Sequence, residues 1–176
     1  MRIIAGSRKG HRIQAPKGAD TRPTSDRARE AAFMLIGPVD GASVLDLYAG
    51  SGAMGLEALS RGAASATFVE SDRGACRTIS ENLEKLRLTG ARVTCADVFW
   101  TLRQDARAYD LVLVDPPYDA WAELEPKLAE HLVRVLAPDG LLVVETSSRI
   151  EPSLPLPLRT SRRYGSARLS LFEHPS

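Results

Sequence analysis

The sequence predicts a doubly wound α/β fold, in which a mostly parallel sheet is covered by helices on both faces. From Ser43 onward, short apolar runs alternate with helical patterns, and the connections between them are short. Such strand–helix–strand repetition joins parallel strands through crossover helices. The chain has 176 residues, of which 44% are hydrophobic and 26% charged, so it is long enough to bury one core. We therefore expect a single domain over residues 1–176.

Five short runs of β-branched and large apolar residues are the predicted strands of this sheet. They are Val44–Leu47, Ala66–Val69, Ala91–Thr94, Leu111–Val114 and Leu141–Val144, of which the third is the weakest. Between them, two stretches place apolar residues at helical spacing. These are Cys76, Ile79, Leu83 and Leu86, and then Leu124, Leu128, Leu132 and Val135.

The first 38 residues depart from this rhythm, and we interpret them as an extension of a core that spans residues 39–176. Arg2–Ala5 and His11–Ala15 flank a basic, glycine-bounded turn, which predicts a small β-hairpin. A helix follows, with Thr24 or Ser25 as its N-cap, and Gly37–Pro38 ends it. The predicted buried face of this helix is Ala28, Ala31, Ala32 and Leu35.

The last residues predict an antiparallel β-hairpin that completes the sheet. Arg159–Tyr164 and Arg168–Phe172 flank the turn residues Gly165–Ser166. Before them lies a stiff linker that contains Pro152, Pro155 and Pro157. A dehydrogenase does not normally end its parallel sheet in such a hairpin.

Composition excludes several classes of protein. The longest apolar stretch, Ala31–Ile36, is far shorter than the roughly 18 residues of a membrane span, and the N-terminus lacks the apolar length of a secretory signal. We expect a monomeric, cytoplasmic protein. Cys76 and Cys95 have neither metal-ligand nor redox-motif spacing and are expected to be reduced core thiols. The histidines pair with no Cys, Asp or Glu at metal spacing, so we expect no metal.

The net charge of +1 hides basic ends around an acidic centre. Residues 1–30 carry a charge of +5 and residues 149–176 a charge of +3, whereas residues 31–148 carry −7. This distribution is typical of a protein whose ends meet a polyanion, although surface arginines that only confer solubility would give the same pattern.

A glycine cluster directly follows the first predicted strand and opens a helix. Gly50, Gly52 and Gly55 have the spacing of the dinucleotide fingerprint, in which glycines permit a tight turn and close approach of a ligand to the backbone. Glu70 ends the second strand, where a carboxylate can accept both ribose hydroxyls of an adenosine. Together these residues indicate an adenosine-containing ligand.

Asp46 favours S-adenosylmethionine over NAD as that ligand. A carboxylate just before the glycines is badly placed beside a pyrophosphate but well placed beside a sulfonium or an amino group. Asp97 follows the third strand, where it is either an acceptor for the adenine amino group or the cap of a helix that starts at Val98. The predicted cofactor-binding residues are Asp46, Tyr48, Ala49, Gly50, Ser51, Gly52, Glu70, Ser71, Asp97 and Val98.

The most specific motif is Asp115-Pro116-Pro117-Tyr118, at the end of the fourth strand. The prolines stiffen the turn and leave carbonyls free to accept, while Asp115 adds a carboxylate and Tyr118 an aromatic face. Such acceptors can bind the exocyclic amine of a nucleobase and stabilise positive charge on its nitrogen as a methyl arrives. These four residues are the predicted catalytic residues.

At this point the sequence resembles the Rossmann-like class I methyltransferases and, within them, the RsmD family of 16S rRNA guanine-N2 methyltransferases. The resemblance spans nearly the whole chain, through Met1–Gly6 with Lys9-Gly10, Arg22–Glu30, Asp46–Gly52, Gly55–Ala63, Asp115–Tyr118 and Tyr164-Gly165. It implies S-adenosylmethionine as donor and guanine 966 of small-subunit rRNA as target. We expect this rRNA to be met within an assembling small subunit, and free rRNA stays open as the alternative. The predicted RNA-binding residues are Arg8, Lys9, Arg12, Arg22, Thr24, Arg27 and Arg163.

Three other functions stay open at this stage. A DNA adenine-N6 methyltransferase also uses the tetrapeptide, but this chain is short for a protein with a separate domain that reads a duplex. A nucleic-acid-binding module without turnover would keep the same fold. An NAD-linked oxidoreductase would bind nicotinamide instead.

Overall fold

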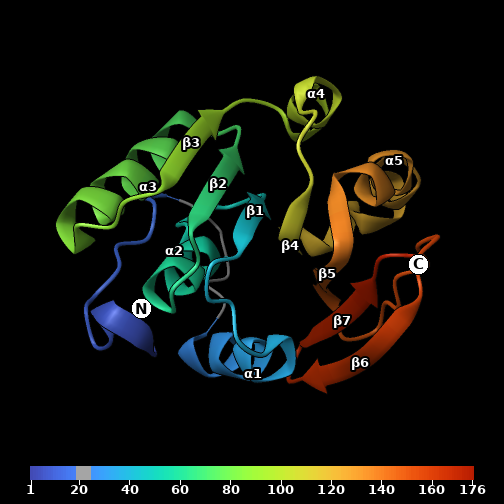
Figure 1. The fold of residues 1–176 in the computed structure, drawn as a ribbon, viewed down its shortest axis with the longest axis horizontal. Coiled ribbons are helices and arrows are strands. Elements are labelled where there is room, and N and C mark those ends of the chain that lie inside the picture. The colour runs from blue at the N-terminus through green and yellow to red at the C-terminus, as the bar shows by residue number, and fades with distance from the viewer. Residues whose placement is uncertain (19–24) are drawn as a thin grey trace.

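The computed structural model describes residues 1–18 and 25–176 and confirms the predicted α/β fold (Figure 1). In these residues the sheet has seven strands in the order β3-β2-β1-β4-β5-β7-β6. The strands are β1 Ser43–Leu47, β2 Ser65–Glu70, β3 Ala91–Cys95, β4 Tyr109–Val114, β5 Leu136–Ser147, β6 Leu158–Tyr164 and β7 Ala167–Glu173. The first five pair in parallel, and β7 runs antiparallel to both β5 and β6.

Helices cover both faces of the sheet (Figure 1). They are α1 Asp26–Ile36, α2 Ala53–Ser60, α3 Arg73–Leu86, α4 Val98–Gln104 and α5 Trp121–Val135. One core contains apolar side chains of α1, α2 and α3, and a second contains those of α4 and α5. Because side chains alternate along a strand, Val143 contributes to the first core and Val144 to the second. The central strands β1, β2 and β4 are therefore buried on both faces, as their apolar runs predict, whereas the edge strands β3 and β6 are partly exposed.

The predicted N-terminal hairpin is reduced to a single antiparallel bridge between Arg2 and Arg12, with a 3-10 turn, η1 Gly6–Arg8, at its tip. A regular ladder does not form because part of this segment bonds to α2 instead. The amides of Ile4 and Ala5 donate to the carboxylate of Glu57 at 2.9 and 3.0 Å. The segment is thus attached to the body of the protein by a buried side chain.

The first helix begins after Ser25, whose hydroxyl accepts from the amide of Ala28, and ends at Gly37 as predicted. Its buried face differs from the prediction, because Arg29 and Phe33 are buried with Ala32. The other predicted members, Ala28, Ala31 and Leu35, are only half-buried. A buried arginine is tolerated here because the buried carboxylate of Glu57 lies 3.5 Å from its Nε. The predicted residues Arg22 and Thr24 lie outside the described part of the chain.

The expectation of two core thiols is wrong for one of them. Cys76 is buried on α3, whereas Cys95 is exposed at the end of β3. The reason is that β3 is an edge strand, which has a neighbour on one side alone.

Membrane-spanning helices and clusters of metal ligands are both absent from the part of the chain that the structure describes. None of their helices combines the length and the apolarity that a membrane crossing requires. No group of three or more His, Cys, Asp or Glu side chains among residues 1–18 and 25–176 is arranged to hold a metal ion.

Candidate active site

The predicted cofactor and catalytic residues lie at one edge of the sheet. β1, β2, β3 and β4 are parallel, so the segments after their carboxyl ends meet at the same edge. Asp46 lies within β1, Glu70 ends β2, and Asp97 is the N-cap of α4. The turn Asp115–Tyr118 follows β4. Ligands of open parallel sheets bind in the crevice at this edge, which makes it the candidate active site.

Asp46 places a carboxyl group beneath the start of α2. Asp46 is 3% exposed, and its Oδ2 accepts a hydrogen bond of 3.0 Å from the amide of Gly55. Burial nevertheless raises the pKa of Asp46 to about 8, and the nearby charge of Glu70 adds to the rise. A buried carboxyl group of this kind favours a cation as its neighbour.

The glycine loop between β1 and α2 has left-handed backbone at Tyr48, Gly50 and Gly52, with φ of 58°, 58° and 79°. A Cβ at Gly50 would meet no atom within 4 Å, so one side of the loop is open. At Gly55 the reason for glycine is different, because a Cβ there would lie 2.4 Å from Cε1 of Phe68. Gly50 therefore allows the left-handed backbone of the loop, and Gly55 allows α2 to pack closely against β2.

Glu70 holds the glycine loop from the neighbouring strand. Its Oε2 accepts from the amide of Gly50 at 2.9 Å, and its Oε1 accepts from the amide of Asp72 at 3.0 Å. Ser71, another predicted cofactor-binding residue, lies between Glu70 and Asp72 in the sequence and is exposed. These contacts fix a half-buried carboxylate at the position from which a ribose would be bound.

Asp97 performs the capping role that was one of its two interpretations. Its Oδ1 accepts from the amide of Trp100 at 2.9 Å, while the side chain stays exposed. Tyr48 lies near Asp97, and its buried hydroxyl has no hydrogen-bond partner among residues 1–18 and 25–176. Burial raises the pKa of Tyr48 to about 12, with a smaller contribution from the charge of Asp97. An unpartnered buried hydroxyl in this region is a free donor for a ligand.

These features fit S-adenosylmethionine. The buried Asp46 suits a sulfonium or an amino group, and Glu70 supplies acceptor oxygens without a donor, which suits the vicinal hydroxyls of a ribose. The open side of Gly50 leaves room for a ligand against the backbone. Tyr48, Ala49, Ser51 and Gly52 complete the same loop, and Val98 opens α4 beside Asp97.

The turn after β4 presents the predicted catalytic residues at the same edge. Asp115 follows Val114, the last residue of β4, and Pro116 is buried. Tyr118 begins the short 3-10 helix η2 Tyr118–Ala120, and its hydroxyl donates a hydrogen bond of 2.7 Å to Oε1 of Glu145. Glu145 lies in β5, beside β4, and is a functional candidate that the sequence analysis missed. Its one sequence signal is an acid at the end of the apolar run Leu141–Val144.

Comparison with known proteins agrees with this geometry. The model of a family described as "Conserved hypothetical protein 95" matches residues 1–173. The chain belongs to this family. It is 40% identical over 161 residues to the "Putative rRNA methyltransferase YlbH" of Bacillus subtilis, a match that covers 86% of this chain and 85% of that protein. It is 38% identical over 160 residues to the "Ribosomal RNA small subunit methyltransferase D" of Escherichia coli, covering 88% of this chain and 78% of that protein.

Solved structures are also similar to this chain. The "Putative methyltransferase yhhF from Escherichia coli" has a TM-score of 0.86 and 35% identity, and the match covers 99% of this chain and 97% of the other. The comparisons confirm the resemblance to the RsmD family and the class I methyltransferase fold. The roles of individual site residues stay predictions.

Two of the basic residues predicted to bind RNA, Arg8 and Lys9, lie away from the carboxyl ends of the parallel strands. The Arg8–Lys9 turn lies at the other end of α2, since the amide of Arg8 donates to the hydroxyl of Ser60 at 3.0 Å. The guanidinium of Arg8 donates to the backbone carbonyls of Leu86 and Arg87 at the end of α3. Because α2 has eight residues, about 12 Å at about 1.5 Å per residue separates this turn from the glycine loop.

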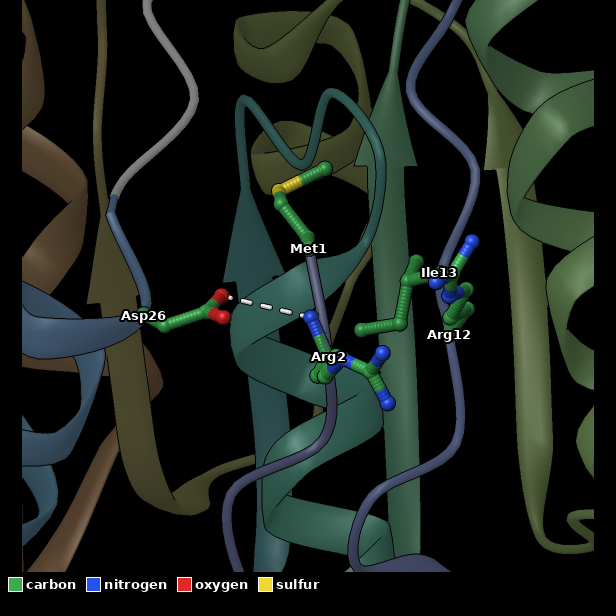
Figure 2. A pocket seen from close by; sticks show the side chains of 5 residues that line it. All are labelled: Met1, Arg2, Arg12, Ile13 and Asp26. Atoms are coloured by element: carbon green, nitrogen blue, oxygen red, sulfur yellow. Dashed lines mark hydrogen bonds between the residues drawn. The ribbon is translucent and has the colours of Figure 1, made fainter.

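Other basic side chains of the N-terminal segment lie closer to the site. Met1, Arg2, Arg12, Ile13 and Asp26 line a pocket of about 390 Å³. In Figure 2, Met1 lies toward the glycine loop. The amide of Arg2 donates to Oδ1 of Asp26 at 3.2 Å. Arg2 was not among the residues predicted from the sequence, but together with Arg12 it places positive charge at this pocket. Arg27 is exposed on α1, and Arg163 is exposed on the edge strand β6.

Proposed function

We propose that this chain methylates the exocyclic N2 amine of guanine 966 in 16S rRNA, with S-adenosylmethionine as donor. The observation that carries the proposal is the Asp115–Tyr118 turn at the carboxyl end of β4, on the same sheet edge as Asp46 and the glycine loop. This arrangement puts acceptors for an amine beside residues that suit a methyl donor. The name of the Escherichia coli relative supports ribosomal RNA of the small subunit as substrate.

Three carboxylates are proposed to hold the cofactor. Asp46 faces its cationic groups, Glu70 accepts from its ribose hydroxyls, and Asp97 accepts from its adenine amine. Bound S-adenosylmethionine supplies a methyl group on a positively charged sulfur, which is the electrophile of the reaction. Glu70 already accepts from the amide of Gly50, so the loop and the ribose are positioned by the same side chain.

The turn after β4 is proposed to activate the target amine. An exocyclic amine is a weak nucleophile, because its lone pair is delocalised into the ring. When the carboxylate of Asp115 and the carbonyl of Pro116 accept its two N–H groups, the lone pair is localised on nitrogen and directed at the methyl group. The nitrogen bonds to the methyl group as the bond from methyl to sulfur breaks, and Asp115 stabilises the positive charge on nitrogen until an amine proton leaves to solvent. Tyr118 stacks on the base. The chemistry requires no covalent intermediate on the protein.

The preference for guanine is proposed to follow from the acceptors in this turn. Guanine presents two adjacent donors, N1–H and N2–H, whereas adenine presents an acceptor at N1. Asp115 therefore gains a second hydrogen bond from guanine alone. The base must leave its stack to reach the turn, which costs least for a base that is already in a loop.

The N-terminal extension, residues 1–38, is proposed to be the RNA-binding side of a monomeric, cytoplasmic enzyme that acts on an assembling small subunit. Arg12, Arg27 and Arg163 are exposed and available to phosphates. The Arg8–Lys9 turn would contact RNA at a distance from the target base. Arg22 and Thr24 are retained as proposed substrate-side residues on the strength of the family resemblance.

The proposal is tested by transfer of labelled methyl groups to free 16S rRNA, small subunits that lack the modification, and duplex DNA. We expect N2-methylguanine at position 966 by mass spectrometry, and the better RNA substrate identifies the assembly stage. Label in DNA adenine would replace this function with an adenine-N6 methyltransferase. Asp115→Ala should abolish transfer while RNA affinity is retained. An absence of label with every substrate would favour a binding module.

A further inference from the structure

Tyr118 and Glu145 form a hydrogen bond that links the target-base turn to the neighbouring strand. The Tyr118 hydroxyl donates to Oε1 of Glu145 at 2.7 Å, and both side chains are half-buried. The two residues are 27 positions apart in the sequence and belong to η2 and β5. A hydroxyl that donates to a carboxylate forms one of the stronger hydrogen bonds in proteins.

The sheet register places Glu145 beside Asp115. β4 and β5 are parallel, with Val114 aligned with Val144, so the residues that follow these two are neighbours at the carboxyl edge. Adjacent strands lie about 4.8 Å apart. Glu145 therefore lies on the strand next to the one from which the turn with Asp115 begins.

Glu145 also lies on the face of the sheet from which Asp46 projects. Its antiparallel partner in β7 is Leu169, and both Leu169 and Val143 belong to the first core. Asp46 is aligned with Leu113 of β4, which belongs to the same core. The Tyr118 hydroxyl is consequently bonded to a carboxylate on the same face of the sheet as Asp46.

A stacking ring acts best when its orientation is fixed before the base arrives. Tyr118 follows two prolines and begins a helix of three residues, so its side chain lies on a short turn, and the bond to Glu145 ties that side chain to a strand of the sheet. Fixing the hydroxyl removes rotamer freedom that would otherwise be lost when the base binds. The bond to Glu145 supplies this orientation.

We propose that Glu145 is a positioning residue of the target-base pocket, which holds the Tyr118 ring in its stacking orientation. This inference rests on the proposed function, in which Tyr118 stacks on the methylated base. Glu145 acts through Tyr118 and affects the turnover of bound RNA more than the binding of RNA, because phosphate contacts supply most of the RNA affinity.

Four variants test this role, namely Glu145→Ala, Glu145→Gln, Tyr118→Phe and the double variant Tyr118→Phe/Glu145→Ala. Loss of a hydrogen bond to a charged group predicts that E145A lowers kcat about 10-fold to 100-fold, with KM for RNA changed less than about threefold. E145Q should recover most of this loss, because its amide oxygen still accepts from the hydroxyl. Glu130→Ala, which removes an exposed carboxylate on α5, is the matched control and should leave kcat unchanged.

The double variant decides whether Glu145 acts through Tyr118. We expect the double variant to be no slower than the slower of the two single variants, since both remove the same bond. Effects of E145A that are equal in the wild-type and Y118F backgrounds would overturn the proposal. An E145A enzyme with wild-type kcat would overturn it too.

A readout independent of activity separates this inference from the proposed function. With ¹³C at the phenol carbon of tyrosine, E145A should shift the resonance that Y118F removes and leave those of the other three of the four tyrosines in place. If the wild-type protein transfers no methyl group to RNA, the proposed function fails. The same spectra still test the bond between Tyr118 and Glu145. A Tyr118 resonance that E145A does not shift means that Glu145 does not hold the ring.

Discussion

The carboxyl group of Asp46 accepts a hydrogen bond of 3.0 Å from the amide of Gly55, the third residue of α2. The amino end of a helix stabilises a negative charge, and this bond lowers the pKa of Asp46. Burial has the larger effect, because the residue is 3% exposed, and it raises the pKa to about 8. Without a ligand, Asp46 therefore carries a proton at neutral pH.

The affinity for S-adenosylmethionine should consequently rise with pH. A cation beside Asp46 favours the charged carboxylate, so binding below about pH 8 must release its proton. We expect affinity to increase by up to about tenfold per pH unit between about pH 6 and 8 and to level off above. Calorimetry in buffers of different ionisation enthalpy measures the proton released. Asp46→Asn should bind weakly with a flat profile, and a flat wild-type profile would contradict the prediction.

The strands and the carboxyl-edge loops could be predicted from the sequence because their signals are local. A strand buried on both faces reads as an apolar run, as Leu111–Val114 does. The glycine spacing after β1 and the prolines after β4 likewise mark turns by their own chemistry. From these signals alone, Asp46, Glu70 and Asp115 could be predicted to lie near the carboxyl ends of neighbouring parallel strands.

The features that the sequence did not predict depend on contacts between distant residues. The burial of Arg29 requires Glu57, on another helix, as its counter-charge. That carboxylate also takes the amides that a longer hairpin would have used. Glu145 is a single acid at a strand end, and only the folded chain brings it to Tyr118. No periodicity or spacing encodes such pairs.

Gly55→Ala should destabilise the protein, although alanine is the better helix former. The added Cβ would lie 2.4 Å from the Phe68 ring and 3.1 Å from Oδ2 of Asp46. Overpacking typically costs about 1–3 kcal/mol, against a gain of about 1 kcal/mol in helix propensity. Urea unfolding should show a net loss, accompanied by weaker cofactor binding. Phe68→Leu opens the space, so the same glycine change should cost less in that background; an equal cost would show that the ring is not the obstacle.

The two cysteines should differ in reactivity. Cys95 is exposed, whereas Cys76 is buried and donates to the backbone carbonyl of Glu70 at 3.2 Å. Burial raises the pKa of Cys76 to about 12, with a further contribution from Cys95, so it holds almost no thiolate at neutral pH. Under native conditions a maleimide should add one label, at Cys95, and Cys95→Ser should remove it. Rapid double labelling of the folded protein would show that Cys76 is accessible.

Glu57→Ala should release the N-terminal segment as well as lower stability. The carboxylate is fully buried, accepts the amides of Ile4 and Ala5, and pairs with Arg61 at 2.8 Å. Its removal leaves the buried guanidinium of Arg29 without this counter-charge, which typically costs about 3–5 kcal/mol. We expect a lower free energy of unfolding in urea and faster tryptic cleavage within residues 1–12.

Two further variants separate the causes of the lower stability and the faster cleavage expected for Glu57→Ala. Without Glu57, the buried Arg29 keeps, among the residues that the structure describes, only the partly exposed Asp26 as a counter-charge. Arg29→Met in the Glu57→Ala background removes this weakly compensated charge and should restore part of the stability, while the segment stays sensitive to trypsin because its amides still lack their acceptor. Glu123→Ala breaks an exposed pair with Lys127 and should change the free energy of unfolding by less than about 1 kcal/mol. If tryptic cleavage of the segment is as slow in Glu57→Ala as in the wild type, the segment is held by its apolar contacts, chiefly Ile3 and Ile13, rather than by the carboxylate.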